Sequence, residues 1–261
     1  MNKINNIFFD LDGTLYFKGK LIKDADKTIK KLRDLQYKIG FLTNTDSLTP
    51  IEITNRINSY GIEAYEYEVI NPVSVALNFI NQNKTKKFFL LTSDSVTEYF
   101  NSKNIYSVND NPDFIIIGDF REKVSYDLIN RVFRHINNGA ELVGFNKGKF
   151  FYNDEGINID TGGFISLFEY SSDKRAIIIG KPEKIFFDMA LVQFNAKNQQ
   201  SLVVGDDITV DIAGANNAGI KSVIVKTGKY NNDIVINSII KPDFTINSVA
   251  EIFSLVDIFS I

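Results

Sequence analysis

Cysteine is absent from the 261-residue sequence, and histidine occurs once, at His135. Without cysteine the chain has no disulfide bond, no thiolate nucleophile and no cysteine-ligated zinc or iron–sulfur cluster. A single histidine leaves histidine-based triads and multi-histidine metal sites without support, and His135, in a helical stretch, is expected to be structural or exposed. The lack of cysteine fits the cytosol best, so we expect a cytoplasmic protein.

Long apolar runs and an excess of basic charge are also missing. Asp10 ends the first apolar run, and the runs at 88–91 and 114–118 are far shorter than the roughly 18 residues of a membrane-spanning helix. The net charge of −3 argues against an extended nucleic-acid interface. Neither a Walker P-loop nor a G-x-G-x-x-G fingerprint occurs. We therefore expect no membrane and no nucleic-acid partner.

The composition is that of a globular protein, with 44% hydrophobic and 23% charged residues. Short apolar runs alternate with amphipathic stretches, a pattern that predicts an α/β fold with a mainly parallel sheet. The length fits one core with one inserted module. Strands are predicted at 4–9, 38–42, 201–204 and 222–225, helices from 24 and at 125–137, and a glycine-rich turn between the apolar runs at 141–145 and 176–180.

The segment Asp10-Leu11-Asp12-Gly13-Thr14 directly follows the first predicted strand, at the sheet edge where open α/β folds bind ligands. Two carboxylates two residues apart repel each other unless a cation neutralises them or one of them is protonated. A nucleophile is ionised, whereas a neighbouring general acid carries a proton. Asp10 and Asp12 are therefore candidate catalytic residues. An ordinary turn is the alternative, since Asp and Gly are common in turns.

Two shorter segments also follow predicted strands. Thr43-Asn44 could bind phosphate through a hydroxyl and backbone amides, or merely close a loop. Lys181, in Gly180-Lys181-Pro182, could neutralise a transferring phosphoryl group, or remain a solvated lysine.

A third segment, GDDITVD, places Asp206, Asp207 and Asp211 at a strand end and the following helical turn. Hard oxygen ligands favour Mg²⁺ over zinc. Capping of the helix is the alternative, above all for Asp207. Because each segment ends a different strand, folding is expected to bring all of them to one crevice.

In this order, DLDGT, TN, GKP and GDDITVD resemble the four motifs of the haloacid dehalogenase (HAD) superfamily, and the match spans nearly the whole chain. The module between the second and third motifs resembles the class IIA, or NagD-like, cap. The resemblance implies a Rossmann-like three-layer core, residues 1–79 and 179–261, and a smaller α/β cap at 80–178. GKPEKIFF and VKTGKY most resemble the phospholysine phosphohistidine inorganic pyrophosphate phosphatases of this group and their HAD-like hydrolase domain-containing relatives.

The resemblance also implies residue roles. Asp10 would be the nucleophile and Asp12 the general acid and base. Thr43 and Asn44 would hold phosphoryl oxygens, and Lys181 would stabilise charge. Mg²⁺ would be bound by the Asp10 side chain, the Asp12 backbone carbonyl and Asp206, with Asp207 or Asp211 in support.

Substrate choice in capped members depends on a cap loop, assigned here to Asn146, Lys147 and Gly162-Gly163. Relatives commonly carry a basic residue shortly after TN, whereas TNTDSLTP has Asp46 and no Lys or Arg. An acidic loop there weakens attraction for highly charged substrates. Related capped proteins often pair through the cap, so a homodimer is expected.

The sequence thus predicts a phosphatase of a small phosphorylated metabolite, with inorganic pyrophosphate or a phosphoramidate as narrower options. A phosphotransferase would share every motif. A phospho-acceptor signalling module is disfavoured by the chain length and by Asp12, which would activate water. A catalytically idle scaffold is disfavoured because Asp10, Asp12, Lys181 and Asp206 are all intact.

Overall fold

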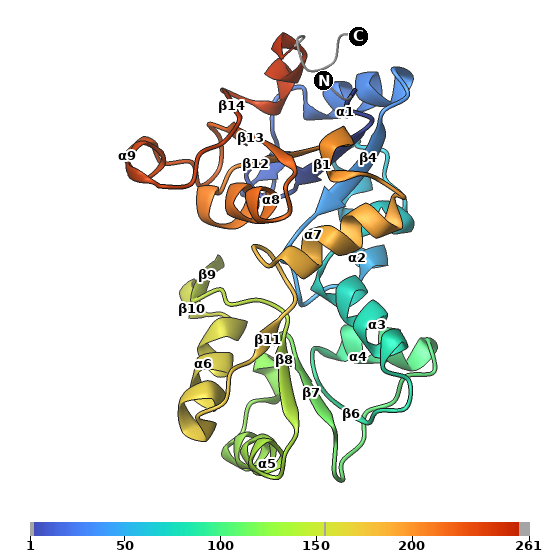
Figure 1. Ribbon diagram of the computed structural model, residues 1–261, viewed down its shortest axis with the longest axis vertical. Coiled ribbons are helices and arrows are strands. Elements are labelled where there is room, and N and C mark those ends of the chain that lie inside the picture. Colours follow the sequence, from blue (N-terminus) through green and yellow to red (C-terminus); the bar gives the residue numbers. More distant parts are fainter. Residues whose placement is uncertain (1–2, 154, 256–261) are drawn as a thin grey trace. The chain divides into compact units, whose positions relative to one another are not determined.

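A computed structural model describes residues 3–153 and 155–255. The chain divides into two compact units (Figure 1). Unit 1 comprises Met1–Thr43, Pro50–Ile70 and Lys181–Ile261, and unit 2 comprises Asn44–Thr49 and Asn71–Gly180. The segment 80–178, which the sequence predicts as the cap, lies within unit 2, and unit 2 also includes the short segment 44–49.

Unit 1 contains a six-stranded sheet in the order β14-β13-β12-β1-β4-β5, and its strand pairs are parallel. Every residue of β1 (Asn6–Asp10) and β12 (Ser201–Gly205) is buried, as expected for central strands with both faces covered. The remaining elements are β2 (Tyr16–Phe17), β3 (Lys20–Leu21), α1 (Ala25–Asp34), β4 (Lys38–Leu42), α2 (Pro50–Ser59), η1 (Glu66–Glu68), β5 (Val69–Ile70), α7 (Lys184–Gln193), η3 (Asn198–Gln200), η4 (Ile208–Ile212), α8 (Ala213–Asn217), β13 (Lys221–Val225), α9 (Asn232–Asn237), β14 (Phe244–Ile246) and η5 (Val249–Ser254).

The helices of unit 1 pack on this sheet through apolar faces. Ala25, Ile29 and Leu32 of α1 are buried at helical spacing, and α1 contacts β4 and η5. Helix α7 lies against α8, where the Phe187 ring comes so close that a Cβ on Gly214 would be 2.0 Å from it. The absence of a side chain at Gly214 therefore allows the two helices to approach.

Unit 2 has its own four-stranded parallel sheet, in the order β11-β8-β7-β6. Helices α5 and α6 contribute Val132, Ile136, Ile165 and Phe168 to a core shared with β6, β7 and β8. The elements of unit 2 are α3 (Pro72–Gln82), β6 (Phe88–Leu91), α4 (Asp94–Ser102), β7 (Phe114–Ile117), η2 (Arg121–Lys123), α5 (Tyr126–Asn137), β8 (Glu141–Gly144), β9 (Phe150–Asn153), β10 (Gly156–Ile159), α6 (Thr161–Ser172) and β11 (Ile177–Ile178).

The prediction of an α/β fold with a mainly parallel sheet is confirmed by both units. The region expected to be a glycine-rich turn instead holds the antiparallel hairpin β9–β10 and helix α6. His135 lies in α5, half-buried, with its ring 5.6 Å from that of Phe89. It is thus a packing residue, as expected.

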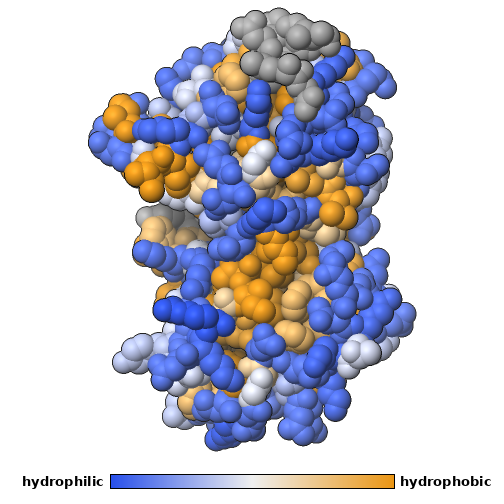
Figure 2. Space-filling view, viewed as in Figure 1, coloured by the Kyte–Doolittle hydropathy of each residue, from blue (hydrophilic) through white to orange (hydrophobic). Residues whose placement is uncertain are grey.

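Polar side chains cover most of the face seen in Figure 2. Apolar side chains gather over α9, where Ile234, Ile236 and Ile239 are exposed. Within the part of the chain that the structure describes, no helix is both long and apolar enough to cross a membrane.

Candidate active site

Lys181 lies at the centre of a buried polar cluster in unit 1. Its Nζ atom donates hydrogen bonds of 2.6 Å to Oδ1 of Asp10 and 2.6 Å to Oδ1 of Asp211. The same nitrogen donates to the carbonyl oxygen of Leu42 at 3.3 Å. Burial alone would lower the pKa of Lys181, but the two carboxylates outweigh burial and hold that pKa above its usual value. The lysine is therefore kept as a cation.

The parallel sheet explains why these groups meet. Asp10 is the last residue of β1 and pairs with Leu42, the last residue of β4. Asp206 directly follows β12, whose Val204 pairs with Phe9 of β1. Neighbouring parallel strands end at the same edge of a sheet, so their following side chains converge there.

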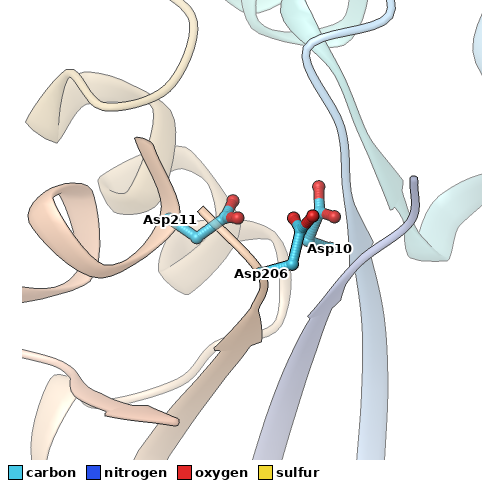
Figure 3. A group of neighbouring side chains, drawn as sticks. All are labelled: Asp10, Asp206 and Asp211. Carbon is cyan, nitrogen blue, oxygen red and sulfur yellow. The ribbon is translucent and has the colours of Figure 1, made fainter. Parts of the chain in front are cut away.

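Three buried carboxyl groups, those of Asp10, Asp206 and Asp211, point toward one another (Figure 3). Each offers one oxygen, and these oxygens lie within 4.8 Å of one another. Burial raises the pKa of Asp206, and the negative charges of Asp10 and Asp211 raise it further. A hard cation with oxygen ligands, such as Mg²⁺, fits these three carboxylates. It would offset the repulsion among them that the single positive charge of Lys181 does not neutralise.

Two glycines form a slot for the Asp206 carboxylate. A Cβ built on Gly13 or on Gly228 would lie 2.0 Å from Oδ2 of Asp206, and both glycines have positive φ, +94° and +59°. The backbone N–H of Lys229 donates to the same oxygen at 2.5 Å. The hydroxyl of Thr227 donates to the carbonyl oxygen of Gly13. This hydrogen bond links the loop that carries Gly13 to the loop that carries Gly228. This slot fixes the direction of the Asp206 carboxylate.

Asp207 and Asp211 occupy different positions in the turn after β12. Asp211 lies within η4, a π-helical turn, and burial raises its pKa while Lys181 opposes that rise. Asp207 instead caps η4: its Oδ1 accepts hydrogen bonds from the N–H of Thr209 at 2.9 Å and from the Thr209 hydroxyl at 2.7 Å. Asp211 thus belongs to the carboxylate cluster with Asp10 and Asp206, whereas Asp207 caps the N-terminus of η4.

Asp12 and Thr43 complete the predicted residues of unit 1. The side chain of Asp12 reaches solvent, yet the surrounding protein removes part of its hydration and raises its pKa, against the lowering effect of nearby cations, chiefly Arg56. A raised pKa suits a carboxyl group that donates a proton. Thr43 is buried directly after β4, and its N–H donates to the carbonyl oxygen of Ile70 at 3.1 Å.

The other predicted residues, Asn44, Asn146 and Lys147, belong to unit 2. Asn146 is buried and donates to Oδ2 of Asp46 at 2.9 Å. Lys147 is exposed, and its Nζ lies 2.7 Å from Oε2 of Glu169. Both side chains thus bond to protein groups of their own unit.

Thr227, Gly228 and Lys229 were not predicted as site residues, although they lie in the VKTGKY segment that carries part of the family resemblance. The glycine after a predicted strand was the available signal, since positive φ next to a ligand-binding edge favours glycine. The hydrogen bonds of Asp46 were not predictable either, because its partners lie far away in the sequence.

Comparison with known proteins shows relatives along most of the chain. The haloacid dehalogenase-like hydrolase model matches residues 7–105, and a HAD-hydrolase-like model matches residues 178–252. The chain is 30% identical over 224 residues to haloacid dehalogenase-like hydrolase domain-containing protein 2 of Mus musculus, covering 86% of this chain and 85% of that protein. It is 29% identical over 236 residues to phospholysine phosphohistidine inorganic pyrophosphate phosphatase of Xenopus laevis, covering 88% and 86%.

Among solved structures, NagD of Escherichia coli K-12 has the same fold. The TM-score is 0.89 at 22% sequence identity, and the match covers 96% of this chain and 99% of NagD.

Proposed function

The chain is an enzyme of the haloacid dehalogenase-like hydrolase family, and from that premise we propose that it is a magnesium-dependent phosphatase with Asp10 as nucleophile. The observation that carries this proposal is the buried Lys181 cation, which bridges Asp10 and Asp211 beside Asp206. An ionised carboxylate held in one orientation next to a fixed cation suits attack on an anionic phosphoryl group.

In the first step, a carboxylate oxygen of Asp10 attacks phosphorus in line with the leaving oxygen. The bond from phosphorus to the leaving group breaks, and Asp12 gives its proton to the leaving oxygen. Lys181 remains a cation and stabilises negative charge as it shifts to the phosphoryl oxygens. Thr43 and Asn44 are assigned to hold those oxygens.

In the second step, Asp12, now ionised, takes a proton from a water molecule. The water oxygen attacks phosphorus, the bond to Asp10 breaks, and inorganic phosphate leaves. The Asp10 carboxylate and the Asp12 proton are both restored, so one site performs both half-reactions.

Asp10, Asp206 and the backbone carbonyl of Asp12 would hold Mg²⁺, with Asp211 in support through its bond to Lys181. When bound, the ion supplies positive charge that neutralises the carboxylates and the phosphoryl oxygens. Asp207 is not assigned to the metal, because its carboxylate caps η4.

The proposed substrate is a small phosphorylated compound. A relative in Xenopus laevis is named for phospholysine, phosphohistidine and inorganic pyrophosphate, which makes phosphoramidates and pyrophosphate natural substrates to compare with phosphomonoesters. We further propose that unit 1 acts as the catalytic core and unit 2 as the cap, that the protein is cytoplasmic, and that two copies pair through unit 2.

The test is phosphate release from a panel of phosphomonoesters, phosphoramidates and pyrophosphate, measured with Mg²⁺ and with a chelator. We expect phosphate release that requires Mg²⁺. The release rates should differ among phosphomonoesters, phosphoramidates and pyrophosphate and so identify the preferred class of substrate. No release from any compound would contradict the proposed function.

A further inference from the structure

Asp46 is a buried carboxyl group that the proposed mechanism does not use. Its side chain belongs to unit 2, and the residue is 5% exposed. Oδ2 of Asp46 accepts a hydrogen bond of 2.9 Å from the side-chain amide of Asn146 and one of 2.6 Å from the hydroxyl of Thr161. Two donors from distant parts of the chain thus converge on one oxygen.

Both donors are themselves held in place. Oδ1 of Asn146 accepts from the N–H of Gly148 at 2.7 Å, which turns the amide nitrogen of Asn146 toward Asp46. Thr161 begins α6, and its N–H donates to Oδ1 of Asp160 at 2.8 Å. Asp46 therefore joins the segment 44–49 to the loop at 146–148 and to the start of α6.

The segment 44–49 has further bonds within unit 2. The side-chain amide of Asn71 donates to the carbonyl oxygens of Thr45 at 3.1 Å and Leu48 at 2.9 Å. The hydroxyl of Ser93 donates to the carbonyl oxygen of Ser47 at 3.0 Å. These contacts hold the backbone, whereas Asp46 supplies the side-chain link to the loop that carries Asn146.

Keeping a carboxylate in this place has a stability cost. Burial raises the pKa of Asp46 to about 7, and the nearby charges of Asp160 and Asp119 also raise it. A buried ionised group without a cationic partner is costly, and such groups are often found where function opposes stability. Such a cost is typical of a residue with a functional role.

The position of Asp46 suggests that role. Asn44, which the proposed function assigns to a phosphoryl oxygen, precedes Asp46 by two residues and lies in the same segment. Its Oδ1 atom is tightly placed, since a Cβ on Gly180 would lie 2.9 Å away. Thr43, the other phosphate-holding residue, belongs to unit 1. A shift of the segment 44–49 would therefore move Asn44.

We propose that Asp46 is a positioning residue, which fixes the segment carrying Asn44 to unit 2 and thereby sets the affinity for the phosphorylated substrate. This inference rests on the proposed function, because that function gives Asn44 its task. Asp46 does not touch substrate in this account, since it is buried and its Oδ2 atom is filled by protein donors.

The test compares Asp46→Ala, which removes the acceptor, with Asp46→Asn, which keeps an acceptor oxygen and the shape. With 4-nitrophenyl phosphate as the probe, we expect KM to rise about tenfold or more in Asp46→Ala, with kcat changed less than about twofold. KM in Asp46→Asn should stay within about threefold of wild type. The conservative variant thus rescues the affinity.

Ser125→Ala is the matched control. Ser125 caps α5 in unit 2, where its hydroxyl oxygen accepts from the N–H of Leu128 at 3.2 Å. Its loss destabilises unit 2 without touching the segment 44–49. A purely structural effect would therefore raise KM in Ser125→Ala as well.

Amide hydrogen exchange of residues 44–49 supplies a readout that needs no turnover. We expect faster exchange there in Asp46→Ala, and wild-type exchange in Asp46→Asn and Ser125→Ala. Unchanged exchange or unchanged KM in Asp46→Ala would overturn the proposal. If the wild-type protein had no phosphatase activity, only the proposed function would be contradicted. The comparison of hydrogen exchange would still decide whether Asp46 holds residues 44–49 in place.

Discussion

The Nζ atom of Lys181 lies 2.6 Å from Oδ1 of Asp10, and both residues are buried. Lys181 makes a second contact of 2.6 Å to Asp211, so one cation serves two carboxylates. Charges removed from water are tolerated when they are paired and hydrogen-bonded. The two hydrogen bonds of Lys181 offset part of the repulsion between Asp10 and Asp211, and in the proposed mechanism Lys181 also stabilises the negative charge of the phosphoryl group.

Replacing Lys181 by Met should destabilise the protein strongly. The variant leaves Asp10 and Asp211 buried without their cation, a change that typically costs about 3–5 kcal/mol. The free energy of unfolding in urea, measured with a chelator, checks this, and Mg²⁺ should restore part of the loss. Lys184→Met is the control, because the pair of Lys184 with Asp188 is exposed and should contribute little. Equal losses in both variants would contradict this account.

Removing the charge of Asp206 should separate metal binding from stability. In Asp206→Asn the repulsion by Asp10 and Asp211 is relieved, so we expect a metal-free protein at pH 8 at least as stable as wild type. Stabilisation by Mg²⁺, about 2.7 kcal/mol at a hundred times the dissociation constant, should disappear. Calorimetric melting temperatures with Mg²⁺ and with a chelator test both points.

Asp207→Asn is the control for the metal site. Asparagine is also a good helix cap, so this variant should keep η4 and its stabilisation by Mg²⁺. If Mg²⁺ still stabilised Asp206→Asn but no longer stabilised Asp207→Asn, the metal would be bound by Asp207 and not by Asp206, which would contradict the proposed site.

A methyl group at Gly13 should displace the Asp206 carboxylate. The new Cβ would lie 2.0 Å from Oδ2 of Asp206, and the backbone at Gly13 has φ +94°. Gly19→Ala is the control, since Gly19 has φ +72° but nothing within 4 Å of its added Cβ. Strain alone should cost about 1 kcal/mol in Gly19→Ala, whereas Gly13→Ala should also lose Mg²⁺ binding in a calorimetric titration. Wild-type Mg²⁺ affinity in Gly13→Ala would contradict the slot.

The raised pKa of Asp46 predicts a pH-dependent effect on stability. Between its ordinary pKa of 3.8 and its folded value of about 7, the folded state holds a proton that the unfolded state has lost. The contribution of Asp46 to stability therefore falls as pH rises through this window, and its full cost, on the order of a few kcal/mol, remains above pH 7.

Asp46→Asn should accordingly be more stable than wild type at pH 8 and close to wild type near pH 4, as measured by urea unfolding. Asp173→Asn is the control, because Asp173 is exposed in the same unit and its charge is hydrated. A difference between Asp46→Asn and wild type that does not vary with pH would contradict this assignment.

The family, the class of fold and the assignment as an enzyme were predictable from the sequence, and the comparisons confirm them. The reason is local: each motif is a set of polar residues that interrupts an apolar run at a strand end. The strand predicted at 38–42 is β4 with the same bounds. The capping alternative for Asp207 was also readable, because an acidic residue before a helix is a local signal.

Helix α6 and the buried position of Asp46 were not predictable in this way. Gly162 and Gly163 suggested a turn, but Gly162 lies in α6, where a Cβ would be 2.4 Å from the carbonyl oxygen of Gly148. Asp46 was expected to form an acidic loop that weakens attraction for highly charged substrates, but its carboxyl group is buried and bonded to Asn146 and Thr161, which are 100 and 115 residues away. Close packing and distant hydrogen bonds are tertiary features, which override local pattern.

The most direct test of the central claim is the turnover of Asp10→Asn with Mg²⁺, using the substrate on which the wild type is most active. The substitution preserves shape and removes the nucleophile, so we expect phosphate release to fall about a thousandfold or more while the circular dichroism spectrum remains that of a folded protein. Phosphate release at the wild-type rate from folded Asp10→Asn would contradict the account.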